Sequence, residues 1–170
     1  MIKILYFDTN AIIKYFFKEE GSDLIKWLVD NRVSNATSLN TSQITLYEFK
    51  KFLKKKEKEL ERITAKSKLY FAKVFRVIDN HKIPGFKKGK DTNYIEICKK
   101  YKLQIKKNGW DARHLSSVIN YLRCYAGESR PYIVTADVNF GKIIEKEGYA
   151  VINPDKITKS EAERILHLNE

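Results

Sequence analysis

The feature that most constrains the fold is a short apolar run at the start of the chain that ends abruptly in an acid. Residues 2–7 are nearly continuously apolar, and Asp8 interrupts them. A run of this length is typical of a strand buried on both faces of a parallel sheet. Helical spacing of apolar residues begins directly afterwards, over 11–16. The pattern therefore predicts a strand, an acidic turn and a helix in immediate succession.

The same succession returns near the end of the chain. "YIVTAD" predicts a strand that ends in Asp137, "VNFGKIIEKEG" a helix, and "YAVINP" a final short strand. Other segments predict an extended stretch near 39–44 and helices near 22–29, 45–63, 70–78, 92–100, 111–126 and 160–168. Strands that alternate with helices through short loops indicate an α/β fold, in which helices cover both faces of a parallel sheet.

Length and charge restrict the classes of protein to consider. A chain of 170 residues fits one hydrophobic core, so we expect a single domain over 1–170. The net charge of +12 favours a polyanionic partner, although lysine richness also occurs in heat-adapted proteomes. No segment has the roughly 20 apolar residues that a membrane span needs, and the first residues do not fit a signal peptide, so we expect a cytoplasmic protein.

Four acids stand at the ends of predicted elements. Asp8 and Asp137 directly follow strands, Glu48 lies near the start of the long helix, and Asp111 begins the helix "DARHLSSVI". Because ligands bind outside the carboxyl ends of parallel strands, this topology can bring the four carboxylates to one edge. Clustered carboxylates repel one another unless protons or cations neutralise them. Oxygen ligands suit Mg²⁺ or Mn²⁺, particularly where phosphate is the partner.

Helix capping is the competing interpretation of each acid. The three aspartates all precede helical patterns, where a carboxylate satisfies exposed backbone N–H groups. Thr45 and Glu48 also match a capping box, with Thr45 as the cap. Capping is the commoner role for any one of these acids, and only the joint pattern favours a shared site. His114 follows on the same predicted helix as Asp111, and we interpret it as an interior histidine rather than a catalytic base.

The sequence resembles the PIN-domain nucleases, and within that family the VapC-type toxin ribonucleases. The resemblance rests on "YFDTNAII", "TSQITLYEFKK", "DARHLSSVI" and "YIVTADVNF" followed by "GYAVINP", which occur in the family's order. The region 66–103 matches weakly. The resemblance implies a three-layer α/β/α fold with a central parallel sheet. It also implies that one or two divalent ions are held by Asp8, Glu48, Asp111 and Asp137.

Neighbouring polar residues acquire supporting roles from the same resemblance. Thr9, Asn10 and Thr135 are expected to orient the acids. Asn139 stands where many relatives carry another acid, so a second metal ion would be held less tightly. The implied activity is metal-dependent hydrolysis of RNA phosphodiester bonds. The implied protein partners are an antitoxin and a second copy of the chain.

The basic segments are the candidates for contacting RNA. "FKKGK" reads as part of a loop, where Phe86 is available for base stacking and Lys87, Lys88 and Lys90 for the phosphate backbone. "KKFLKKKEK" mixes lysine with glutamate and reads better as a solvated helix face.

Two alternatives to a ribonuclease stay open. A haloacid-dehalogenase-like phosphatase would use a strand-end aspartate as nucleophile, but its second aspartate would fall at Asn10. A PIN-like module that binds RNA or protein without cleaving is compatible with Asn139.

Overall fold

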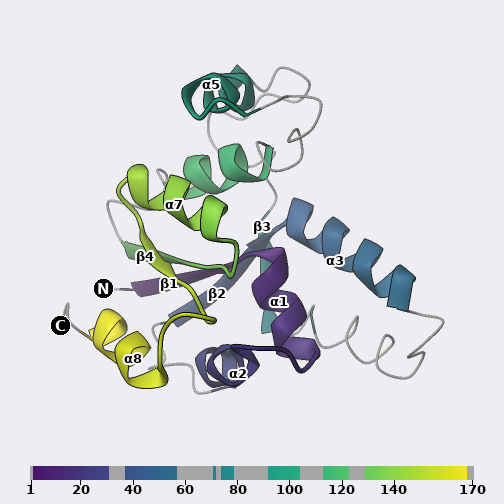
Figure 1. Ribbon diagram of the computed structural model, residues 1–170, viewed down its shortest axis with the longest axis vertical. Coiled ribbons are helices and arrows are strands. Elements are labelled where there is room, and N and C mark those ends of the chain that lie inside the picture. The colour runs from purple at the N-terminus through teal and green to yellow at the C-terminus, as the bar shows by residue number, and fades with distance from the viewer. Residues whose placement is uncertain are drawn as a thin grey trace.

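The computed structural model describes residues 2–30, 37–56, 71, 74–78, 92–103, 113–122 and 129–167. Five strands form one parallel sheet in the order β3-β2-β1-β4-β5 (Figure 1). They are β1 (Ile2–Phe7), β2 (Thr37–Ser42), β3 (Arg76–Ile78), β4 (Ser129–Val134) and β5 (Ala150–Ile152). The predicted parallel α/β architecture is therefore confirmed.

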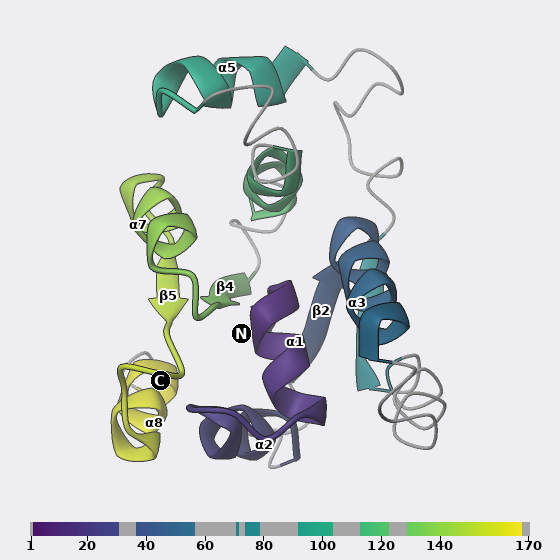
Figure 2. The same ribbon diagram turned by 45° about the vertical axis from the view of Figure 1, so that its right-hand side comes forward.

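Helices lie on both faces of this sheet. The labelled helices are α1 (Thr9–Phe16), α2 (Ser22–Asp30), α3 (Gln43–Lys56), α5 (Thr92–Lys100), α7 (Val138–Lys146) and α8 (Lys159–His167), and a further helix spans 113–122. Residues of α1, α2, α3 and α8 share one hydrophobic core, while those of α5, α7 and the 113–122 helix share another (Figure 2). None of the helices described is long and apolar enough to cross a membrane.

Strand β1 contributes to both cores, which explains its nearly continuous apolar run. In β1, Leu5 and Phe7 pack with α1, α2, α3 and α8, whereas Ile4 and Tyr6 pack on the opposite face. Side chains of a strand alternate between the two faces of its sheet, so a strand covered on both sides often reads as a nearly continuous apolar run. The three-layer α/β/α arrangement follows from this alternation.

The strand order places a crevice beside β1. The chain proceeds from β1 outward to β2 and β3, and then returns to β4 on the other side of β1. Helix α1, which follows β1, and α7, which follows β4, lie on opposite faces of the sheet (Figure 1). Loops that diverge in this way leave a ligand-binding crevice at the carboxyl edge. Phe7 is in register with Val134, so the turns that follow these two residues are neighbours.

The segment 70–78 corrects one sequence-based expectation. We predicted a helix there, but Arg76–Ile78 forms β3 and pairs with residues 40–42 of β2. Phe71 and Val74 are helical, so the helix and the strand share one apolar run. A three-residue edge strand is too short for its period to be separated from a preceding helical pattern.

The start of α3 corrects a second expectation. The helix begins at Gln43, and the Ser42 hydroxyl accepts a hydrogen bond from the Thr45 N–H at 3.1 Å. Ser42 therefore takes the capping position that the competing capping-box interpretation gives to Thr45, because β2 ends at Ser42 and the helix follows without a loop. Neither Thr45 nor Glu48 is therefore needed to cap α3, and both side chains can contact other parts of the protein. The part of the predicted helix beyond Lys56 lies outside the described residues.

Two glycines offer a paired test of the backbone. Gly21 and Gly148 both have positive φ, of 73° and 86°. A Cβ on Gly21 would lie 2.6 Å from the carbonyl oxygen of Pro154, whereas one on Gly148 would meet no described atom within 4 Å. We expect Gly148→Ala to cost about 1 kcal/mol of unfolding free energy and Gly21→Ala at least twice as much, in urea titrations. Equal losses would show that the close approach to Pro154 does not matter.

Candidate active site

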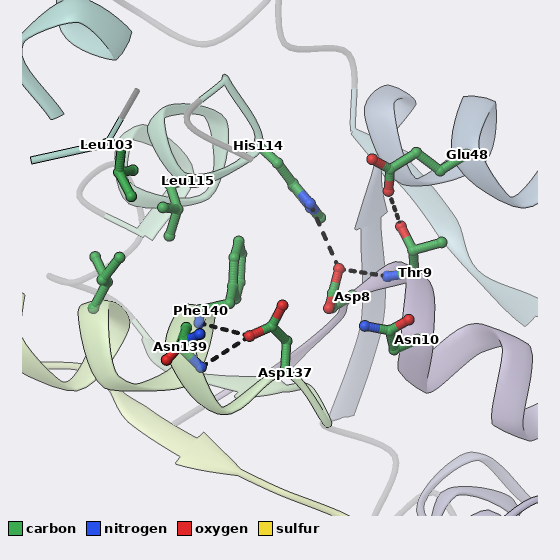
Figure 3. Close-up of a pocket in the computed structure, with 11 residues that line it drawn as sticks. Asp8, Thr9, Asn10, Glu48, Leu103, His114, Leu115, Asp137, Asn139 and Phe140 are labelled. Carbon is green, nitrogen blue, oxygen red and sulfur yellow. Dashed lines mark hydrogen bonds and ion pairs between the residues drawn. The ribbon is translucent and has the colours of Figure 1, made fainter. Parts of the chain in front are cut away.

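A pocket of about 330 Å³ opens at the carboxyl edge of the sheet, at the crevice between β1 and β4 (Figure 3). Its lining comes from distant parts of the sequence: Asp8, Thr9, Asn10, Glu48, Leu103, His114, Leu115, Asp137, Asn139, Phe140 and Ile143. Three of the four predicted acids therefore share one pocket. The fourth, Asp111, lies outside the described residues.

Asp8 is the most enclosed of these acids, with 5% of its surface exposed. Its Oδ1 accepts a hydrogen bond of 2.6 Å from the Thr9 N–H, and its Oδ2 accepts one of 2.8 Å from the Thr135 hydroxyl. The His114 Nδ1 lies 3.5 Å from Oδ1. Both oxygens of Asp8 are thus engaged from different directions, which fixes the plane of the carboxylate.

Glu48 reaches the pocket from the opposite wall. It is half-buried on α3, and its Oε2 accepts a hydrogen bond from the Thr9 hydroxyl (Figure 3). Thr9 therefore contacts two acids, one through its backbone N–H and one through its side chain. The glutamate that the capping-box pattern assigned to its own helix instead joins α3 to the start of α1.

Asp137 is exposed and caps α7. Its Oδ1 accepts hydrogen bonds from the backbone N–H groups of Asn139 at 2.8 Å and Phe140 at 3.0 Å. Within the described part of the chain, its second oxygen makes no hydrogen bond or ion pair, and the side chain extends toward Asp8 in Figure 3. The capping interpretation and the shared-site interpretation therefore describe the same residue. One oxygen serves the helix and the other faces the pocket.

Thr135 joins the two aspartates. Its side chain is completely buried, and its hydroxyl accepts a hydrogen bond of 3.1 Å from the Asp137 N–H while donating to Asp8. The backbone N–H of Thr135 itself is held by the carbonyl of Ile152 at 3.1 Å. A single hydroxyl thus sets the separation of the acids that follow β1 and β4.

A buried polar network adjoins Asp8 on the side of the 113–122 helix. The His114 Nε2 lies 3.0 Å from the Tyr6 hydroxyl and 3.1 Å from the Thr45 hydroxyl. Burial raises the pKa of Tyr6 well above its ordinary value, so its hydroxyl keeps its proton. His114 is 4% exposed, which confirms the interpretation of an interior histidine. Its contact with Asp8 was not predicted.

The remaining wall of the pocket is apolar, and sequence reasoning did not assign it to the site. It consists of Leu103, Leu115, Phe140 and Ile143. All four also pack in or against the core that includes α5, α7 and the 113–122 helix. Their spacing in the sequence is that of core residues, so no signal distinguished them from the rest of the core.

The donor chemistry of the pocket fits a hard divalent cation. Three carboxylates and the amide side chains of Asn10 and Asn139 line it, and oxygen donors are the ligands that Mg²⁺ and Mn²⁺ prefer. Among the described residues, no three His, Cys, Asp or Glu side chains are close enough together to hold one ion. Mg²⁺ usually keeps several waters and is held by one or two carboxylates, so such a group of three is not needed. Asp111, the further predicted ligand, lies outside the described residues. The predicted RNA contacts Phe86, Lys87, Lys88 and Lys90 also lie there.

Comparisons with known proteins agree on the architecture. The sequence matches the PIN domain over residues 5–143. The fold is similar to VapBC2 from Rickettsia felis bound to a DNA fragment from its promoter, with TM-score 0.54, 18% identity, and coverage of 88% of this chain and 98% of the other. It is also similar to VapBC-1 from nontypeable Haemophilus influenzae, with TM-score 0.52, 17% identity and coverage of 90% and 99%. No curated protein matches the sequence.

Proposed function

Because this chain belongs to the PIN domain family, we propose that it is a divalent-metal-dependent ribonuclease that hydrolyses RNA phosphodiester bonds. The observation that carries the proposal is the pocket at the carboxyl edge of the sheet. Asp8, Glu48 and Asp137 line it together, although they lie far apart in the sequence. These carboxylates repel a polyanion such as RNA, even in a protein of net charge +12. A bound cation neutralises them and lets the polyanion approach the pocket.

We assign the carboxylates to Mg²⁺ or Mn²⁺. Asp8 and Asp137 are the proposed ligands within the described residues, and Asp111 is the proposed third. The bound ion supplies a Lewis acid that polarises the phosphodiester and lowers the pKa of nearby water. Thr135 holds Asp8 and the turn of Asp137 in register, and Thr9 orients Asp8. Asn10 and Asn139 lie at the rim of the pocket, where their side-chain amides hydrogen-bond water.

Glu48 has a separate role in this proposal. Its Oε2 is held by the Thr9 hydroxyl, so its Oε1 is the oxygen available to the reaction. That oxygen orients the attacking water and accepts its proton, or completes the ligand set of the metal. Lysine and arginine side chains are expected to neutralise the RNA backbone. Phe86, Lys87, Lys88 and Lys90 stay the predicted RNA contacts.

We further propose that the protein is the toxin of a toxin-antitoxin pair. The two VapBC structures that share its fold support this assignment. The expected partners are then an antitoxin that covers the acidic pocket and a second copy of the chain. A ribonuclease toxin needs such a partner, because unrestrained RNA cleavage would harm the cell that makes it.

The test is incubation of the purified protein with a mixed-sequence single-stranded RNA in Mn²⁺, Mg²⁺ or EDTA. A phosphate monoester serves as a parallel substrate. We expect internal cleavage of RNA with either metal, no cleavage in EDTA, and no release of phosphate from the monoester. Binding of RNA without cleavage under every condition would favour the non-cleaving module. Hydrolysis of the monoester alone would favour a phosphatase.

A further inference from the structure

A network of buried polar groups lies beside Asp8, with His114 at its centre. We infer that His114 is a positioning residue for the metal site: its Nδ1–H orients the Asp8 carboxylate, and the hydroxyls of Tyr6 and Thr45 select the tautomer that can do so. The inference deepens the proposed function, on which it rests, because it gives Asp8 the role of a metal ligand.

Three separate elements bring the network together. Tyr6 comes from β1, Thr45 from the first turn of α3, and His114 from the 113–122 helix. All three side chains are at most 4% exposed. Ser42 extends the network, with its hydroxyl 3.2 Å from that of Thr45. Buried polar groups need partners, so each contact here restricts the others.

The chemistry of the partners determines which nitrogen carries the proton. A carboxylate only accepts hydrogen bonds, so the nitrogen that faces Asp8 must donate. The Nδ1 is that nitrogen, at 3.5 Å from Oδ1. In the neutral imidazole, the Nε2 then keeps its lone pair and accepts from a hydroxyl, at 3.0 Å from Tyr6 or 3.1 Å from Thr45. The Tyr6 and Thr45 hydroxyls can each donate to this nitrogen.

The distance of 3.5 Å between His114 Nδ1 and Asp8 Oδ1 suits a hydrogen bond that shortens when the metal ion binds. Hydrogen bonds at active sites are often long before the ligand binds and shorten in the complex. Thr9 and Thr135 already engage one oxygen each, so His114 adds a third direction of restraint. Hydrogen bonds to the ligating side chains of a metal site typically change metal affinity roughly 10–100-fold.

Two amide substitutions distinguish the role of the His114 Nδ1 from that of its Nε2. In His114→Asn the side-chain N–H group falls near the position of Nδ1, whereas in His114→Gln the amide reaches toward the position of Nε2. We expect His114→Asn to bind Mn²⁺ within about threefold of the unmodified protein and His114→Gln to bind it roughly 10–100-fold more weakly. Urea unfolding of both variants measures their stability independently. Equal loss of Mn²⁺ affinity in the two variants, in step with their loss of stability, would overturn the inference.

The tautomer provides a readout that needs neither metal nor RNA. Long-range ¹H–¹⁵N NMR of the ¹⁵N-labelled protein distinguishes a protonated ring nitrogen from an unprotonated one, and the signals that vanish in His114→Gln belong to His114. We expect a protonated Nδ1 and an unprotonated Nε2. A proton on Nε2 would overturn the inference. If the unmodified protein binds no Mn²⁺ while the tautomer is as expected, the failure lies in the proposed metal site and not in the orientation of Asp8.

Discussion

Asp8→Asn is expected to reduce metal-dependent RNA cleavage by roughly a thousandfold or more, the scale on which active sites lose rate when one electrostatic contact is removed. The substitution keeps the shape of the side chain but removes its charge, and an amide is a much poorer ligand for Mg²⁺ or Mn²⁺. Single-turnover cleavage of the same RNA measures the loss. Near-normal cleavage by this variant would contradict the assignment of Asp8 to the metal.

The surroundings of Asp8 define the control for this experiment. One of the two hydrogen bonds from Thr9 and Thr135 must meet an NH₂ group in the variant, so we expect a cost of about 1–3 kcal/mol in unfolding free energy. Circular dichroism and urea unfolding show whether the fold survives that cost. Asp23→Asn is the matched substitution, because Asp23 is exposed in the first turn of α2 and does not line the pocket. It should cleave RNA at the normal rate.

Phe49→Ala is expected to cause the largest loss of stability, about 3–5 kcal/mol. Phe49 is 1% exposed on α3, and its ring stacks between those of Phe16 and Phe71, with centroids 5.2 and 5.3 Å away. Removing it leaves a cavity at the junction of three elements. Urea unfolding with a constant m-value measures the loss.

Phe52→Ala is the matched control on the same helix. Phe52 is only partly buried and makes an edge contact with Phe17. It should therefore cost clearly less than Phe49→Ala. If the two substitutions cost the same, the stacked rings of Phe16, Phe49 and Phe71 are not the centre of this core.

The strands that carry the site were predictable because their sequence signal is local. The apolar runs before Asp8 and Asp137 are long enough to identify buried strands, and the helical pattern begins immediately after each acid. Parallel topology then required the two acids to share one edge of the sheet. The sequence could not identify β3, because a strand of three residues has no period of its own.

The contacts among the site residues were less accessible to sequence reasoning. Thr45 and Glu48 satisfy a capping pattern, yet Ser42 caps the helix, and only the structure shows Glu48 beside Thr9. The contact between Asp8 and His114 joins the turn after β1 to a helix more than a hundred residues later. No spacing rule within one element reveals such a pair. The parts played by Asp111 and the "FKKGK" segment stay predictions.

Mn²⁺ binding tests the central claim most directly, because it does not depend on finding the right RNA. Electron paramagnetic resonance measures free Mn²⁺ during titration of the unmodified protein, Asp8→Asn and Asp23→Asn. We predict that the unmodified protein and Asp23→Asn bind Mn²⁺ equally, and that Asp8→Asn binds it at least about tenfold more weakly. Equal binding by all three proteins, or no binding by any of them, would contradict a metal site centred on Asp8.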